Sequence, residues 1–451
     1  MKQVKQRTLL IFLLVLLLSG GVIFFCVRYV TRGAQWAAFS ANDHAYTDGR
    51  LSAGLVLDRS GVMLYDPATA SYHEDSAVRK ATLHAVGDPD NNISTSAKSA
   101  LRSHLVGFNP LTGTTGGGHK LYLTLDAALC RTAYEELGGR KGAVGVYNYE
   151  TGDILCMVST PTFDPADPPE ISDDDDSYEG VYLNRFLSAA YTPGSVFKII
   201  TTAAALENIP DVMERSFTCS GSYTIGDETI TCPHHHGEMD FYGIFANSCN
   251  CAYAQLAAEL GGDILRQYAD CAGLLTSHTV SEIETAAGSY TIGNSGQVGW
   301  SGVGQYDDLV NPCAMMTLMG AIAADGKAAQ PHLIARETSM NGLSLFDGEN
   351  SGKVKAPWSA ETSETLRCMM QNNVVETYGQ SNFGDLAICA KSGTAEVGDG
   401  KAPHAWFTGF LDDAQHPLAF TVIVENGGGG AQAAGSIASA VLQQAVENRD
   451  D

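Results

Sequence analysis

The sequence predicts an α+β fold in which helices cover an antiparallel sheet, placed after a single N-terminal transmembrane helix and a short pedestal region. Three observations predict it. Residues 8–27 carry no charge, apolar helical runs fill the middle of the chain, and three strand-like segments followed by a helix close it. No internal repeat is visible in the sequence.

Composition narrows the classes of function. The chain has 451 residues, 44% of them hydrophobic, which is enough for a sizeable core. The formal net charge of -24 argues against a nucleic-acid partner, because phosphate binding needs clustered Lys and Arg. The acidity is spread out except from Asp173 to Asp176, which we interpret as a solvated loop.

The first segment is predicted to be a membrane anchor over residues 8–30, after a cytoplasmic tail of residues 1–7. About 20 apolar residues span a bilayer as a helix. Basic residues precede the span, which favours a cytoplasmic N-terminus and an extracytoplasmic remainder. A cleavable signal peptide is the alternative, although the apolar run exceeds a typical signal core and residues 37–41 form a poor cleavage region.

Residues 31–135 are predicted to form a linker and a small pedestal. The expected elements are a strand, turn and strand over 51–62, a loop over 93–118, a strand over 120–126 and a helix from Asp126 to about Leu137. This region is too small to carry obvious chemistry. We interpret it as a spacer between the membrane and a catalytic domain that fills residues 136–451.

The catalytic region is predicted to open with a β-hairpin over residues 142–159. Further helices are expected over 196–206, 241–260, 263–274, 311–324, 360–375 and 433–447, a loop over 286–305, and strands over 386–392, 404–411 and 418–425. Strands near both ends with a helical middle favour an antiparallel sheet covered by helices.

The cysteines do not form a disulfide scaffold. There are eleven of them, scattered along the chain, and Cys26 lies in the predicted span. Cys219 and Cys232 bracket a short segment with a glycine turn and could pair in an oxidising compartment. Residues 232–236, Cys-Pro-His-His-His, are of the types that bind metal ions. They lack a second spaced pair of Cys or His ligands, so no zinc site is predicted.

The chemistry centres on Ser195 and Lys198, which lie three residues apart where an apolar helix begins. Residues three apart share a helix face, so we expect the Ser195 hydroxyl to meet the Lys198 amine. Free backbone N–H groups of the first turn can serve a developing oxyanion. Burial lowers a lysine pKa, and a neutral amine can accept the serine proton. Taken alone, the pair would be better interpreted as a capping serine and an ordinary surface lysine.

Two further groups change that interpretation. Ser248 and Asn250 lie two residues apart at the start of a helix, where a hydroxyl can relay a proton and an amide can hold a lysine or a carbonyl. Lys391–Thr394, Lys-Ser-Gly-Thr, end a strand, where polar groups could bind a carboxylate and the glycine could let a substrate backbone pass. Separately, these groups would be a capping motif and an ordinary edge strand.

In this order, Ser-x-x-Lys, Ser-x-Asn and Lys-Ser-Gly-Thr form a set found in penicillin-binding proteins and β-lactamases. The chain resembles the class B penicillin-binding proteins, membrane-anchored D,D-transpeptidases of bacterial cell-wall synthesis, over residues 51–445. Supporting stretches are Gly142–Val144, Thr151–Leu155, Pro161–Pro165, Leu183–Arg185, His236–Gly237, Gly304–Gln305 and His404–Phe410. The chain departs from the family at Cys130, where Gln is usual, at Ser392, where many members have Thr, and in its short N-terminal region.

The resemblance implies a role for each residue. Ser195 attacks the D-Ala-D-Ala carbonyl of a stem peptide, and Lys198 is its base. Ser248 relays the proton to the departing D-Ala, and Asn250 holds Lys198 and the substrate. Lys391 orients the terminal carboxylate or supports Ser248. The remaining contacts implied are substrate binding by Ser392, Gly393 and Thr394, and an oxyanion hole from the backbone N–H groups of Ser195 and Thr394.

The resemblance also implies covalent inhibition by β-lactams, no metal or organic cofactor, and a membrane glycosyltransferase as partner, since the region before residue 142 is too small to hold one. A D,D-carboxypeptidase or β-lactamase-like hydrolase is the alternative, but no Glu is clearly placed to activate water. A non-catalytic β-lactam sensor or scaffold is the third possibility. The complete motifs and the short tail of residues 1–7 argue against it.

Overall fold

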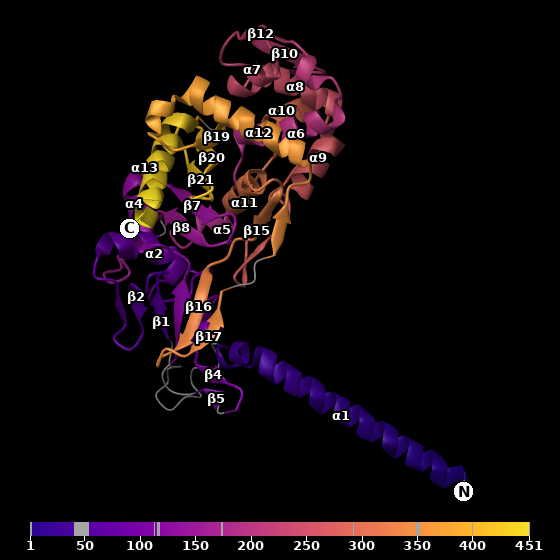
Figure 1. Ribbon diagram of the computed structural model, residues 1–451, viewed down its shortest axis with the longest axis vertical. Coiled ribbons are helices and arrows are strands. Elements are labelled where there is room, and N and C mark those ends of the chain that lie inside the picture. Colours follow the sequence, from indigo (N-terminus) through magenta and orange to yellow (C-terminus); the bar gives the residue numbers. More distant parts are fainter. Residues whose placement is uncertain are drawn as a thin grey trace.

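The computed structural model describes residues 2–39, 54–111, 113–114, 118–172, 175–291, 293–348, 352–398 and 400–450. They form a helix that projects from the rest of the molecule, a lower sheet, and a larger body with a second sheet and most of the helices (Figure 1). Residues 40–53, which contain most of the expected linker, lie outside the described residues, as do Asp173 and Asp174 of the acidic run.

Helix α1, Lys2–Ala37, points away from the rest of the molecule (Figure 1). Among the described residues it is the one helix that is long and apolar enough to cross a membrane. The C-terminal part of α1 contacts the region of the lower sheet, where the ring of Tyr29 lies edge-on to Phe108 with 5.6 Å between ring centroids. The predicted span of residues 8–30 therefore lies within a longer helix.

The lower sheet has six strands in the order β17-β16-β6-β1-β2-β3. The strands are β1 Leu55–Leu57, β2 Met63–Asp66, β3 Ser71–Tyr72, β6 His119–Leu123, β16 Ile334–Ser339 and β17 Ser344–Asp347. β1 pairs parallel with β6, and β16 pairs antiparallel with the other side of β6. The sequence pattern did not predict β16 and β17, because most of their side chains are polar or exposed. Strands from both halves of the chain thus build one sheet.

The body is built on a five-stranded antiparallel sheet in the order β19-β20-β21-β7-β8. Its strands are β7 Gly142–Asn148, β8 Ile154–Thr160, β19 Ile388–Ala395, β20 His404–Leu411 and β21 Leu418–Val424. The early hairpin joins the late strands because β21 pairs with β7 along its whole length. Every residue of β7, β8 and β21 is buried, so both faces of the sheet are covered. The predicted fold class is confirmed.

Helices cover the two faces of this sheet (Figure 1). On one face lie α4 Ala127–Leu137 and α13 Gly430–Asp450, which pack on each other; on the other lies α11 Pro312–Ala323. Asn311 caps α11 and Pro312 opens it, as predicted. Nearly all of α11 is buried, which fits its uniformly apolar sequence.

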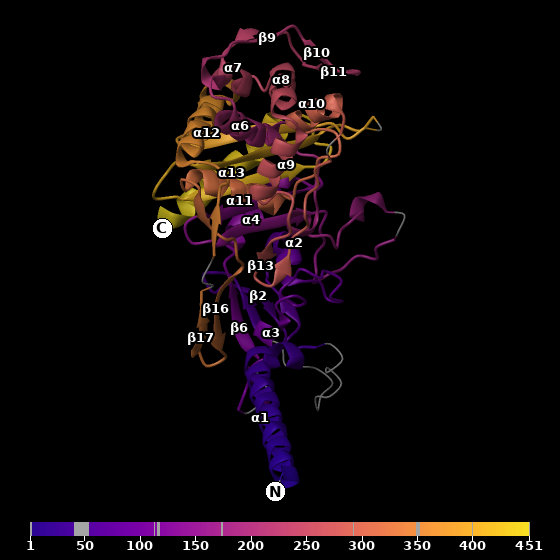
Figure 2. The ribbon, with the colours of Figure 1, turned by 90° about the vertical axis from the view of Figure 1, so that its right-hand side faces the viewer.

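The upper part of the body is mostly helical (Figure 2). Its helices are α6 Lys198–Asn208, α7 Phe241–Ala246, α8 Asn250–Leu260, α9 Gly262–Cys271, α10 Ser295–Val303 and α12 Ala360–Asn373. The remaining α-helices and strands are α2 Ser76–Val86, α3 Arg102–Leu105, β4 Phe108–Asn109, β5 Gly113–Thr114, α5 Arg185–Ser188, β9 Phe217–Cys219, β10 Ser222–Ile225, β11 Glu228–Thr231, β12 Gly237–Met239, β13 Thr279–Val280, β14 Ile283–Glu284, β15 Lys327–Ala329 and β18 Lys353–Lys355.

The single helix expected over residues 241–260 is wrong. Two helices, α7 and α8, replace it, and residues 247–249 separate them. Ser248 has φ of +50°, a left-handed conformation that a right-handed helix cannot contain. The break is therefore set by one backbone conformation that the apolar pattern does not reveal.

The loop expected over residues 286–305 is also wrong, because it contains α10. Asn294 and Gln297 start this helix with a capping box. Its glycines, which suggested a loop, serve close packing: a Cβ on Gly302 would lie 2.3 Å from the Cβ of Ala257 in α8. Tertiary packing thus overrides the weak helix propensity of glycine.

Candidate active site

Ser195 lies in a tight turn before α6. Gly194–Phe197 form a 3-10 helix that continues directly into α6. Gly194 has φ of +55°, and its N–H donates to the carbonyl oxygen of Gly304 at 2.8 Å. A side chain would not fit there, since a Cβ on Gly194 would lie 2.8 Å from the carbonyl oxygen of Thr394. The turn therefore places Ser195 beside β19.

The Lys198 side chain is fully buried and points to the second motif. Its amine donates to the Ser248 carbonyl oxygen at 2.5 Å, to Ser248 Oγ at 3.1 Å and to Asn250 Oδ1 at 2.8 Å. Burial lowers the pKa of Lys198 to about 7, so much of the amine is neutral near neutral pH. Among the described residues, the hydrogen bonds of this amine reach Ser248 and Asn250 and not the Ser195 hydroxyl.

Ser248 lies between two buried amines. Its hydroxyl accepts a second hydrogen bond from Lys391 Nζ at 3.0 Å. Lys391 is fully buried, and burial together with the nearby charge of Lys198 lowers the pKa of Lys391. The left-handed backbone at Ser248 is a strained conformation of the kind that clusters at active sites. It directs both the carbonyl and the hydroxyl of Ser248 toward Lys198.

Asn250 starts α8 and is held by three contacts. Its Oδ1 accepts from Lys198, its Nδ2 donates to the carbonyl oxygen of Thr231 at 2.9 Å, and its backbone N–H donates to Cys232 Sγ at 3.0 Å. The amide is thus oriented with its oxygen toward the lysine. The structure brings Lys198, Ser248, Asn250 and Lys391 together as expected from their motifs.

The third motif lies on β19, at the edge of the central sheet. Thr394 is exposed, and its hydroxyl accepts from the N–H of Gly430 at 3.3 Å. The absence of a side chain at Gly393 also serves packing, in addition to the substrate approach predicted from the sequence. A Cβ there would lie 2.8 Å from the carbonyl oxygen of Pro193 and 3.0 Å from Val196 Cγ1, so this glycine lets the Ser195 turn pack on β19.

Tyr378 is a site residue that sequence reasoning missed. Its hydroxyl accepts the N–H of Ser392 at 2.9 Å and lies 3.1 Å from Ser392 Oγ. Desolvation raises the pKa of Tyr378, so the hydroxyl stays neutral. Tyr378 ends the π-helical turn Val374–Tyr378 that follows α12, and such wide turns are frequent at functional sites. An apolar helical pattern gives no sign of that turn.

A cavity of about 500 Å³ opens beside these groups, within the range of about 300–1,000 Å³ typical of ligand pockets. Ser248, Tyr378 and Ser392 line it. The other lining residues are His234, His235, His236, Ala246, Asn247 and Thr377. No lining residue in the described part of the chain is acidic.

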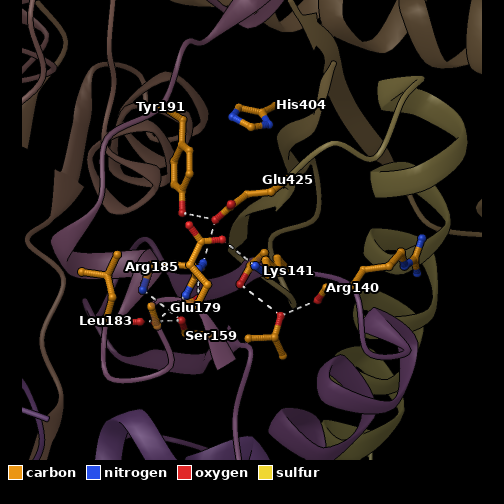
Figure 3. A network of polar contacts seen from close by, with 12 residues as sticks. Arg140, Lys141, Ser159, Glu179, Leu183, Arg185, Tyr191, His404 and Glu425 are labelled. Carbon is orange, nitrogen blue, oxygen red and sulfur yellow. Dashed lines mark hydrogen bonds and ion pairs between the residues drawn. The ribbon is translucent and has the colours of Figure 1, made fainter. Parts of the chain in front are cut away.

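An ion pair supports the segment that leads into the Ser195 turn (Figure 3). Arg185 Nε lies 2.6 Å from Glu425 Oε1, and the Tyr191 hydroxyl donates to the same oxygen at 2.8 Å. Arg185 also donates to the carbonyl oxygen of Gly180 at 2.7 Å. Because Glu425 directly follows β21, this network ties the chain before Ser195 to the central sheet.

Comparison with known proteins identifies the family. The family described as "Penicillin binding protein transpeptidase domain" matches residues 142–447, about two thirds of the chain. The chain belongs to this family. The predicted family and its transpeptidase class are thereby confirmed, and all three motifs of this penicillin-binding protein lie inside the matched range.

Relatives and solved structures agree with this family. Peptidoglycan D,D-transpeptidase PbpA of Mycolicibacterium smegmatis is 28% identical, over 92% of this chain and 87% of its own length. The penicillin G acyl-enzyme complex of M. tuberculosis penicillin-binding protein A has a TM-score of 0.76 at 23% identity, over 88% of this chain and 99% of that one. A peptidoglycan synthase complex, described as coordinating polymerization and crosslinking, has a TM-score of 0.61 at 24% identity, over 74% of this chain and 63% of that one. These likenesses confirm the fold.

Proposed function

We propose that the chain is a peptidoglycan D,D-transpeptidase that cross-links stem peptides through an acyl-enzyme on Ser195. The observation that carries the proposal is the buried chain of groups beside the Ser195 turn, in which the Ser248 hydroxyl lies between the amines of Lys198 and Lys391. Such a chain can both accept and deliver a proton, as acyl transfer requires.

In acylation, neutral Lys198 accepts the hydroxyl proton of Ser195 while Oγ attacks the carbonyl carbon of the D-Ala-D-Ala bond. In this structure the Lys198 amine is hydrogen-bonded to Ser248 and Asn250 and not to Ser195. A hydrogen bond from Ser195 would form when substrate binds, as catalytic hydrogen bonds often do. The proton then passes through Ser248 to the nitrogen of the terminal D-Ala. The C–N bond breaks, D-Ala leaves as an amine, and the ester on Ser195 remains.

Binding is assigned to the backbone and to the edge of β19. The N–H groups of Ser195 and Thr394 form the oxyanion hole, and Asn250 holds Lys198 and a substrate carbonyl. Ser392, Gly393 and Thr394 bind the peptide. Gly393 contributes through its backbone, since its α-carbon faces the Ser195 turn. Lys391 supports Ser248, which it already contacts, or orients the terminal carboxylate.

The amine of a second stem peptide then attacks the ester carbonyl, and its proton passes through Ser248 and Lys198 to Ser195 Oγ. The ester C–O bond breaks, which forms the cross-link and restores the Ser195 hydroxyl. We place this acceptor in the cavity beside Ser248 and Ser392. A carboxypeptidase or β-lactamase would need a base for water, and the cavity offers no carboxylate from the described residues. We expect a β-lactam opened by Ser195 to remain as a long-lived ester, as membership of the penicillin-binding family implies.

Helix α1 is proposed to anchor the chain with residues 1–7 in the cytoplasm, residues 31–135 as linker and pedestal, and residues 136–451 as the extracytoplasmic transpeptidase domain. The basic residues before the apolar run support this orientation. A membrane glycosyltransferase is the proposed partner, and the likeness to part of a peptidoglycan synthase complex supports it. Copurification of such a polymerase from membranes is the expected result.

Time-resolved labelling with a fluorescent penicillin tests the function. We expect a stable adduct on the full chain and none on Ser195→Ala, because the ester bond needs the Ser195 oxygen. Ser436→Ala, an exposed serine of α13, is the matched control and should label like the parent. A label that forms and clears within seconds would indicate a hydrolase, and no label on the folded parent would contradict catalysis.

A further inference from the structure

Four side chains with metal-ligating atoms converge next to the second motif. Cys219 ends β9, Cys232 follows β11, His236 precedes β12, and Cys249 lies between α7 and α8. Their ligand atoms, three Sγ and one imidazole nitrogen, all lie within 4.8 Å of one another. Figure 1 shows α7, α8, β10 and β12 grouped at the top of the body, where these segments meet.

The spacing of the sulfur atoms fits two ligands of one ion. Cys232 Sγ and Cys249 Sγ lie 3.7 Å apart. In a regular tetrahedral site with Zn–S bonds of about 2.3 Å, two sulfur ligands lie about 3.8 Å apart. Metal coordination would therefore need little movement of these two side chains.

The surroundings supply what such a site needs. Nδ1 of His236 is shielded from solvent and has no hydrogen-bond partner among the described residues, so its lone pair is available to a metal ion. Cys219 and Cys249 are buried and Cys232 and His236 are partly buried, so two of the four ligands are shielded from bulk water. The N–H of Asn250 donates to Cys232 Sγ at 3.0 Å, as outer hydrogen bonds to metal-bound thiolates commonly do.

We propose that Cys219, Cys232, His236 and Cys249 bind one zinc ion. Three thiolates and one imidazole suit zinc and exclude magnesium and calcium, which prefer oxygen ligands. Four protein ligands complete a tetrahedron, so the zinc is structural and takes no part in acyl transfer. The ligands follow the pattern Cys-x12-Cys-x3-His-x12-Cys, in which no two cysteines are close in sequence.

The zinc would position the second motif. Cys249 lies between Ser248 and Asn250, so a metal bond to its sulfur holds the strained turn that directs the Ser248 hydroxyl to Lys198. Cys232 adds a second tie through its contact with the Asn250 backbone. This positioning role rests on the proposed function, whereas the zinc site itself does not.

Metal analysis of the full chain, purified in detergent without chelator, tests the site. We expect one zinc ion per chain, and cobalt exchanged into the site should give thiolate-to-cobalt charge-transfer absorption and the intense visible bands of tetrahedral cobalt. Cys232→Ser and His236→Ala should lose the metal. Cys271→Ser removes an exposed cysteine and is the matched control that should keep it. A zinc-free parent, with a disulfide among Cys219, Cys232 and Cys249 or with all three freely alkylated, would overturn the proposal.

β-Lactam acylation tests the positioning role. Removing zinc should slow acylation about 10- to 100-fold, the range found when groups that orient a site are lost, and added zinc should restore it. Ser195→Ala should keep its zinc while losing acylation, so the two proposals fail separately. Unchanged acylation of the folded, zinc-free chain would overturn the positioning role and leave the metal site standing.

Discussion

Lys198 is fully buried, so bulk water does not stabilise its charged form, and its reactivity is expected to depend on pH. Burial lowers the pKa of Lys198 to about 7, and the groups that face it are Lys391 and the thiols of Cys232, Cys249 and Cys251. The neutral amine is the form that accepts a proton from Ser195. Below its pKa the amine is protonated, so each further pH unit should lower the acylation rate about tenfold.

The measurement is the second-order rate constant for β-lactam acylation from about pH 5 to about pH 9, with one inflection near neutral pH expected. Lys198→Arg should fail to acylate at every pH in this range, since guanidinium does not deprotonate. Circular dichroism at each pH confirms that the chain stays folded. A flat profile for the parent would show that Lys198 is not the base.

At this scale, much of the site could be predicted from sequence. Ser195 and Lys198 are local neighbours, and the order of the three motifs identified the rest. Tyr378 was missed because its place beside Ser392 depends on segments that meet only in the fold. Cys219, Cys232 and His236 were noted in the sequence, but no zinc site was predicted because the fourth ligand, Cys249, joins them only in the fold. Cys249 is the middle residue of the Ser-x-Asn motif, but the other proposed ligands lie in β9 and in the loop after β11.

Between elements, the contact of the Ser195 turn with β19 depends on glycine. A Cβ at residue 393 would lie 2.8 Å from the Pro193 carbonyl oxygen, a backbone atom that cannot yield without moving the turn. We predict that Gly393→Ala costs about 1–3 kcal/mol of stability by overpacking. Acylation should fall further, by about 100-fold, because catalytic groups displaced by about 1 Å lose that much.

Thermal unfolding and acylation rates of Gly393→Ala check this prediction. Gly429→Ala is the matched control, since a Cβ there would meet its nearest atom only at 3.9 Å and its backbone needs no left-handed angle. The control should match the parent in both measurements. An alanine at residue 393 with normal acylation would show that the turn and the strand adjust independently.

Helices and strands were predicted correctly where their own apolar pattern determines them, and missed where contacts with other segments do. The strands of the central sheet and α11 are long and apolar, so the pattern of apolar residues was enough to predict them. Helix α10 was not predicted because its glycines are typical of loops. In the fold, Gly299 and Gly302 allow the helix to pack closely against Ile230 and Ala257. The break before α8 follows from the backbone of Ser248, which serves the site rather than the helix.

Over the whole molecule, the chain crosses three times between the lower sheet and the body: after β6, before β16 and after β17. Strand β6 has β1 on one side and β16 on the other, and β16 arrives more than 200 residues later. Helix α4, which belongs to the predicted pedestal by sequence, packs on β8 and α13 of the body. The apolar pattern could not show this, because the strands that complete the sheet are polar and short.

We therefore predict that residues 54–135 do not fold alone. Without β16 one edge of β6 is unpaired, and without β8 and α13 the buried face of α4, including Leu129 and Ala133, is exposed to water. NMR spectra of this fragment should show poor amide dispersion. The amide signals of residues 54–451 should be well dispersed, and this longer chain should unfold in one thermal transition because side chains from both sheets pack in one hydrophobic core. A folded fragment, or two separate transitions in the longer chain, would show that the lower sheet is an independent unit onto which β16 merely docks.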